Sequence, residues 1–415
     1  MNSSETPGLW TRDFTIITLG SVVSMMGNAM SGFAMSLLVL DYTSSPFLYA
    51  IYIALFTLPQ IVMPVFSGAF LDRFSRKRMI YTLDFLSAVL YAAAAMILAT
   101  GWFSFPVFAI YTFLIGSINS VYTVAYESFY PLLISEGNYS KAYSISSVLE
   151  TISAVMVPVA TFAYNQVGIA PLFGINAVSF LIAAIVETRI RTKEEYVEKQ
   201  KATAESKAGK QLLIDMIEGG KYLLSERGLF AVAVYFTFSA FAGGASQVIT
   251  LPFFKSTFEN GEYVYMLVWG MALVGRGIGG IIHYFLRIPV RWKYRIAFFV
   301  YLTTCTIEGL YLYFGIPVMM AMCFASGILG ITSYTIRVSA TQSYVPDEKK
   351  GRFNGAFNML NTIGSLSGEL LAGAVASALP PQYVLTGFMA INALSAVVFI
   401  GGNRRHVAKI YNTQQ

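Results

Sequence analysis

Long apolar runs separated by short polar stretches make up most of this 415-residue chain. Twelve runs can be counted between turn residues, and each is long enough for a helix to cross a hydrocarbon layer of about 30 Å. They lie near residues 13–41, 47–71, 77–100, 104–133, 140–166, 170–189, 228–256, 262–286, 294–314, 317–345, 351–379 and 382–402. The pattern predicts an all-α membrane protein with twelve transmembrane helices.

One long polar segment divides the runs into two sets of six. It spans roughly residues 190–227 and mixes Lys, Arg and Glu with few apolar residues, which is typical of a solvated linker. We therefore expect an N-terminal six-helix bundle at residues 1–189 and a linker at residues 190–227. Residues 228–415 are expected to form a C-terminal six-helix bundle with a short tail.

Basic loops orient these helices. The loop after the second run, residues 72–78, contains four Lys or Arg residues, and short basic loops stay on the cytoplasmic side. The loops after the eighth and tenth runs and the C-terminal tail are also basic, whereas the opposite loops are almost free of Lys and Arg. We therefore expect a multi-pass membrane protein with both termini and the linker in the cytoplasm.

Composition argues against several classes of function. Hydrophobic residues make up 56% of the chain and charged residues 12%, compared with about 25% charged residues in soluble domains. The net charge of +6 comes from residues clustered in short loops, so we expect contact with the lipid bilayer and no nucleic-acid partner. The two cysteines, Cys305 and Cys323, lie in apolar runs, and neither a metal site nor a disulfide is expected. No nucleotide-binding loop and no catalytic constellation stand out, so we expect no enzyme, no cofactor and no nucleotide.

The basic loop carries a recognisable motif. It runs Gly-x-x-x-Asp-Arg-x-x-Arg-Lys-Arg from Gly68 to Arg78, and it resembles the loop signature of the major facilitator superfamily, with Ser75 where the family usually has Gly. The resemblance implies a cytoplasmic gating loop that acts as a latch, although these charges could instead serve only to set the topology. The residues of this gating loop are Gly68, Asp72, Arg73, Arg76, Lys77 and Asp84.

Further stretches resemble the macrolide-efflux branch of that superfamily, a drug-exporter group that is also similar to siderophore exporters. They are residues 69–84, 139–190, 216–230 and 351–353. Two features depart from the pattern of the proton antiporters in the superfamily. Gly116 occupies the position of an Arg in the fourth helix, and residues 153–158 keep the proline but not the glycines of a motif in the fifth. The driving ion, protons or another, is therefore left open.

Ionisable side chains within the spans are costly and mark candidate coupling sites. In the fold implied by the resemblance, Glu127 and Arg337 approach the central cavity and would form a charge pair, either a protonation switch or a fixed closure of the cytoplasmic end. Glu150 lies about nine residues, or about 13 Å, into the fifth span. The full set of proton-coupling candidates is Glu127, Glu150, Arg337, Glu308 and Glu369.

Alternative explanations remain for several of these residues. For Glu308 and Glu369, a hydrogen bond to a neighbouring helix explains the acid at least as well as a role in transport. We expect Arg276 to pair with an acid, and the glycines around it to allow close helix packing. The candidates for the substrate cavity come from the spans expected to line it: Met25, Asn28, Met35, Tyr122, Tyr126, Phe238, Gln247 and Tyr334.

These observations lead to one expected function. The chain is expected to be a monomeric, inner-membrane secondary active exporter that moves a small amphipathic, macrolide-type compound by alternating access in exchange for protons. The alternatives are a siderophore or other metabolite exporter, and a lipid or lysolipid transporter of the same fold.

Overall fold

The structure analysed is a computed structural model of the chain. It describes residues 9–71, 75–135, 142, 145, 156–192, 218, 220–285 and 288–412. Throughout these ranges the regular structure is helical, which confirms the predicted all-α class.

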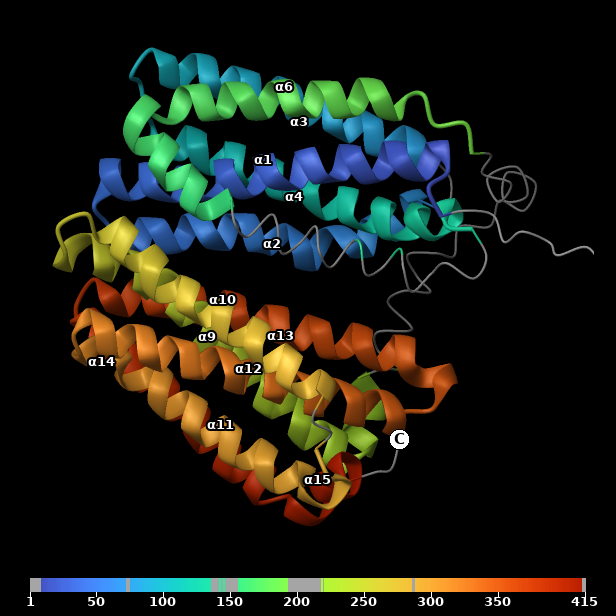
Figure 1. Ribbon diagram of the computed structural model, residues 1–415, viewed down its shortest axis with the longest axis vertical. Coiled ribbons are helices and arrows are strands. Elements are labelled where there is room, and N and C mark those ends of the chain that lie inside the picture. The colour runs from blue at the N-terminus through green and yellow to red at the C-terminus, as the bar shows by residue number, and fades with distance from the viewer. Residues whose placement is uncertain are drawn as a thin grey trace, which may run out of the picture. The chain divides into compact units, whose positions relative to one another are not determined.

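The first half of the chain forms long helices joined by short connections (Figure 1). Thr11 caps the first of them by accepting a hydrogen bond from the backbone N–H of Phe14, and Ser75 caps the third by accepting one from Arg78. Residues 156–167 are helical, and Gly168, with a φ of +77°, allows the turn into the next helix. The helices are α1 (Arg12–Thr43), α2 (Pro46–Leu71), α3 (Arg76–Ala99), α4 (Phe105–Phe129) with a short turn η1 (Tyr130–Leu133), and α6 (Ile169–Glu187).

The second half repeats this arrangement of long helices and short turns. Proline lies at the first or second position of two of these helices, where its missing N–H costs nothing. The helices are α9 (Arg227–Thr257), α10 (Gly261–Phe285), α11 (Lys293–Leu310), α12 (Ile316–Tyr344), α13 (Asp347–Ala376), α14 (Pro381–Ser395) and α15 (Arg404–Tyr411). The short turns are η2 (Val290–Trp292) and η3 (Tyr311–Tyr313), and η4 (Ala396–Gly401) is a π-helix that continues α14.

Ten helices of the described ranges are long and apolar enough to cross a membrane. Their bounds lie within a few residues of the predicted spans. The predicted span at 140–166 falls largely outside the described residues, and α13 begins with a charged turn and is not among the ten. The number of twelve spans therefore stays a prediction, as do the three expected domains.

Contacts divide the chain into two compact units, Met1–Ser44 with Leu55–Leu212, and Ser45–Ala54 with Leu213–Gln415. In the first unit α6 packs against both α1 and α3, and Figure 1 shows these three helices running alongside one another. In the second unit α13 packs on α9, and α10 packs on α12. A buried cluster that includes Tyr235, Tyr301 and Phe353 forms part of the core of this second unit.

Glycines bring α10 and α12 into backbone contact. A Cβ atom on Gly275 would collide with the carbonyl oxygen of Phe324, and one on Gly279 would lie 3.1 Å from the Cα of Ile328. The expectation that the glycines around Arg276 serve helix packing is confirmed for these two positions. It is wrong for Gly277 and Gly280, which have no atom within 4 Å of the place where a Cβ would lie.

Gly275→Ala should therefore lower the free energy of unfolding by about 1–3 kcal/mol, because the added methyl group forces the two backbones apart. Gly277→Ala is the matched control, since its methyl group meets open space and alanine favours the helix. Detergent-denaturation curves of the purified variants provide the measurement. Equal stability of the two variants would contradict the packing role.

Candidate functional site

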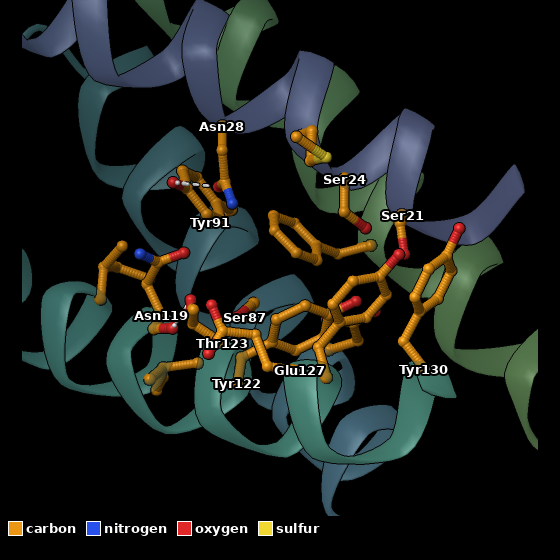
Figure 2. Close-up of a pocket in the computed structure, with 16 residues that line it drawn as sticks. Ser21, Ser24, Asn28, Ser87, Tyr91, Asn119, Tyr122, Thr123, Glu127 and Tyr130 are labelled. Carbon is orange, nitrogen blue, oxygen red and sulfur yellow. Dashed lines mark hydrogen bonds between the residues drawn. The ribbon is translucent and has the colours of Figure 1, made fainter. Parts of the chain in front are cut away.

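A cavity of about 550 Å³ lies inside the first unit, between α1, α3, α4 and α6 (Figure 2). This volume is within the range of sites that enclose drug-sized molecules. The residues around it combine hydroxyl and amide groups, two acids and several aromatic rings. They include Ser21, Ser24, Met25, Asn28, Asp84, Ser87, Tyr91, Asn119, Tyr122, Thr123, Tyr126, Glu127, Tyr130 and Phe180.

Helical spacing explains why these side chains converge. On α1, the residues that line the cavity recur three or four positions apart, which places them on one face. They are Ser21, Ser24, Met25 and Asn28, and Figure 2 shows the labelled three extending from α1 toward the side chains of α4. The hydroxyl of Tyr91 on α3 donates a hydrogen bond of 3.1 Å to Oδ1 of Asn28 and links the two helices across the cavity.

Stacked aromatic rings form one side of the cavity. The rings of Tyr122 and Tyr126 on α4 are stacked with centroids 6.1 Å apart, and Tyr126 stacks on Tyr130 at 5.2 Å. Tyr91 stacks on Phe180 of α6 at 5.5 Å. The cavity thus presents flat, polarizable surfaces beside hydroxyl and carboxyl groups, which suits an amphipathic ligand.

Two buried acids meet beside this cavity. Asp84 on α3 is 1% exposed and Glu187 on α6 is 0% exposed, and their carboxyl groups are within hydrogen-bonding reach of each other. Within the described residues, Oδ2 of Asp84 and both carboxyl oxygens of Glu187 are buried and have no hydrogen-bond donor. Gly20 of α1 closes over the pair, since a Cβ there would lie 2.8 Å from Oε1 of Glu187.

The other acids predicted as coupling candidates have different surroundings. Glu127 lines the cavity and has no ion pair within the described part of its own unit. Glu150 lies outside the described residues. Glu308 on α11 accepts a hydrogen bond of 2.6 Å from Ser326 on α12, and Glu369 on α13 accepts one of 3.0 Å from Ser365. The bond from Ser326 is the contact between neighbouring helices that was expected if Glu308 has a structural role.

Arg337 on α12 lies among aromatic rings. Its guanidinium carbon is 4.7 Å from the ring centre of Phe357, 5.0 Å from that of Phe236 and 5.5 Å from that of Tyr334. Within its own unit the described residues give it no acidic partner. Because Arg337 and Glu127 belong to different units, the proposed pair between them stays a prediction.

Arg276 on α10 has no ion pair among the described residues, so the expected acid partner is not found there.

The gating-loop residues fall into two groups. Arg76 donates a hydrogen bond of 2.8 Å to the carbonyl of Ser128 at the end of α4, and Lys77 donates one of 3.0 Å to the carbonyl of Ile190 after α6. These contacts satisfy carbonyls that a helix end leaves without a partner. Asp72 and Arg73 lie outside the described residues, and Gly68 lies near the end of α2. Asp84 was assigned to the gating loop, but it is buried inside α3.

Four of the eight predicted cavity residues line this cavity, namely Met25, Asn28, Tyr122 and Tyr126. Met35 is 2% exposed in the core of the first unit. The others belong to the second unit: Phe238 stacks on Phe399 at 6.1 Å, Tyr334 is next to Arg337, and Gln247 is exposed on α9.

Helix packing explains why a glycine, rather than a residue with a side chain, occupies position 116. A Cβ at this position would lie 2.8 Å from the carbonyl oxygen of Phe56 and 3.2 Å from its Cα, because α4 approaches the backbone of α2 there. An arginine therefore cannot be accommodated with these helices in contact.

The sequence analysis missed Glu187, since it lies two residues before the predicted end of a span, where acids are common. The signal that could have found it is the apolar run of residues 169–186 that precedes it without a single charge.

The fold and the cavity define a class of protein: a multi-pass membrane transporter rather than an enzyme. The chain belongs to the Major Facilitator Superfamily, whose family model matches residues 17–369. This assignment confirms the resemblance inferred from the loop motif.

Similar proteins refine this assignment. The chain is 24% identical over 380 residues to macrolide efflux protein A of Streptococcus pyogenes, covering 89% of each chain. It is 24% identical over 294 residues to the uncharacterized MFS-type transporter YkuC of Bacillus subtilis, covering 67% of this chain and 68% of the relative. A bacterial homologue of the iron transporter ferroportin, in its inward-facing state, shares the fold with a TM-score of 0.71 and 15% identity, over 97% of this chain and 99% of the other. The nucleoside transporter NupG shares it with a TM-score of 0.66 and 13% identity, over 95% and 98%.

Arg337→Gln should lower the free energy of unfolding by about 1–2 kcal/mol, because the contacts of the cation with three rings are lost. Arg276→Gln is the control, because no ion pair, hydrogen bond or ring contact involves that arginine in the described part of the chain; it should change stability by less than about 0.5 kcal/mol. Unfolding in detergent measures both. Equal losses would show that the rings do not stabilise Arg337.

Proposed function

We propose that the protein is a secondary active exporter of amphipathic, drug-like compounds of the macrolide type. The observation that carries the proposal is the cavity of about 550 Å³, which combines stacked tyrosines with hydroxyl, amide and carboxyl groups. A molecule with an apolar body and a few polar groups suits such a lining. The relative from Streptococcus pyogenes, named for macrolide efflux and matched over 89% of its length, supports the same class of substrate.

Transport is proposed to occur by alternating access, with two six-helix bundles moving around the substrate and protons moving in the opposite direction. The acids beside the cavity supply groups that can gain and lose a proton. The proposal places a monomer in the inner membrane of a bacterium with both termini in the cytoplasm, as the basic loops indicate. Arg76 and Lys77 would then hold the cytoplasmic ends of α4 and α6.

Inside-out vesicles that contain the protein should accumulate a labelled macrolide and a fluorescent amphipathic cation when a proton gradient is imposed. Tyr122→Ala should reduce apparent affinity about fivefold, because a stacked ring contributes roughly 1 kcal/mol to binding. Tyr383→Ala is the control, since its ring lies outside the cavity and is 63% exposed. Transport unaffected by the gradient would indicate a different driving ion.

The assay also separates the alternatives. Transport of neither probe, with correctly folded protein, would reject the drug-export proposal in favour of a metabolite or a lipid substrate. A leaflet-resolved assay with labelled lysolipid then distinguishes these two.

A further inference from the structure

Asp84 and Glu187 present an unusual combination of burial and charge. Both are almost fully enclosed, at 1% and 0% exposure, in helices that cross the membrane. Carboxyl groups in such positions are normally paired with a base or with several donors. Here the group within hydrogen-bonding reach of each is the other acid.

The other groups around the pair do not neutralise it. Tyr122 approaches from α4, and from α1 come the hydroxyl of Ser21 and the backbone at Gly20. The nearby basic residue Lys77 directs its ammonium to the carbonyl of Ile190 at 3.0 Å. No positively charged side chain of the described residues forms an ion pair with either carboxyl.

Unpartnered hydroxyls beside the pair give a second, independent sign of a ligand. Ser21 and Ser24 are each 3% exposed, and their hydroxyl oxygens have no hydrogen-bond partner in the described ranges. Both line the cavity that Asp84 also reaches, and Figure 2 shows them extending from α1 into it, on the side facing Tyr122 and Glu127. A water or a proton carrier in this space would satisfy them.

Electrostatics decides the state of the two acids. Two ionised carboxylates in contact repel strongly where little water is present, and neither has a counter-ion. The arrangement is stable if one carboxyl carries a proton and donates it to an oxygen of the other, as in pairs of acids that share a site. Glu187 is enclosed, whereas Asp84 lines the cavity, so the proton can reach the pair through Asp84.

We propose that Asp84 and Glu187 hold one shared proton and form the proton site of the antiport, so that coupling resides on α3 and α6. A proton taken from water on one side of the membrane forms an O–H bond on one of the two carboxyl groups. The same bond breaks when the proton is released to water on the opposite side of the membrane, and no electron is transferred. This inference rests on the proposed exporter function. Glu127, which lines the cavity from α4, then serves the substrate rather than the proton.

Purified protein in proteoliposomes allows exchange and coupling to be measured separately. With one proton per substrate, a gradient of one pH unit supports up to about tenfold accumulation of the labelled macrolide by wild type. Asp84→Asn and Glu187→Gln should each abolish this accumulation. Glu187→Gln, whose side chain does not line the cavity, should retain exchange of labelled for unlabelled macrolide at equal pH, which requires no net proton movement. Glu259→Gln, in the connection between α9 and α10, is the control and should accumulate like wild type. Full gradient-driven accumulation by both variants of the pair would overturn the proposal.

Infrared spectroscopy tests the proton without relying on transport. Wild type near neutral pH should show a protonated-carboxyl band that disappears in the double variant Asp84→Asn/Glu187→Gln and persists in Glu259→Gln. If no band distinguishes wild type from the double variant, the shared proton is rejected, even when the variants are inactive or unstable. If wild type transports no macrolide but shows the band, the exporter proposal fails while the proton site stands.

Discussion

No water is available inside a bilayer to hydrogen-bond a backbone amide or a charged group, and the arrangement of this chain follows from that constraint. Long helices satisfy their own backbone groups, which leaves only the helix ends. Arg76 and Lys77 supply donors to carbonyls at the ends of α4 and α6. At the start of α1, Asp13 accepts hydrogen bonds from the backbone N–H groups of Arg191 and Thr192 and so joins α1 to the end of α6. Arg76 and Lys77 of the basic motif therefore have a structural role.

The same constraint acts on side chains, and the two units meet it differently. In the second unit, the guanidinium of Arg337 lies among aromatic rings, and Glu308 accepts a hydrogen bond from Ser326, so these two groups have local partners. In the first unit, Asp84 and Glu187 interact with each other and have no basic partner among the described residues. Buried polar groups without local partners lower the stability of the fold, and such groups are concentrated at functional sites. Because of this difference, we assign the proposed proton site to the first unit, which also contains the cavity.

The family model that matches residues 17–369 establishes the family, and relatives at 24% identity do not by themselves identify the substrate. The fold itself hosts unrelated cargoes, as the iron transporter homologue and the nucleoside transporter among its structural neighbours illustrate. Under the proposed function, a few side chains on the faces of α1, α3 and α4 that line the cavity would decide what is bound. In this chain those faces carry serines, asparagines and tyrosines, a lining that differs from a purely apolar pocket.

The sequence by itself determined the helical class, the position of most spans and the family, because apolar length and loop charge are properties of consecutive residues. It also identified Met25, Asn28, Tyr122 and Tyr126 as candidates, because spans of this family that line a cavity can be named from their order. Only the tertiary structure placed Asp84 of α3 against Glu187 of α6. These residues are far apart in the chain, and the rotation of each helix about its axis depends on packing against its neighbours, which no local pattern records.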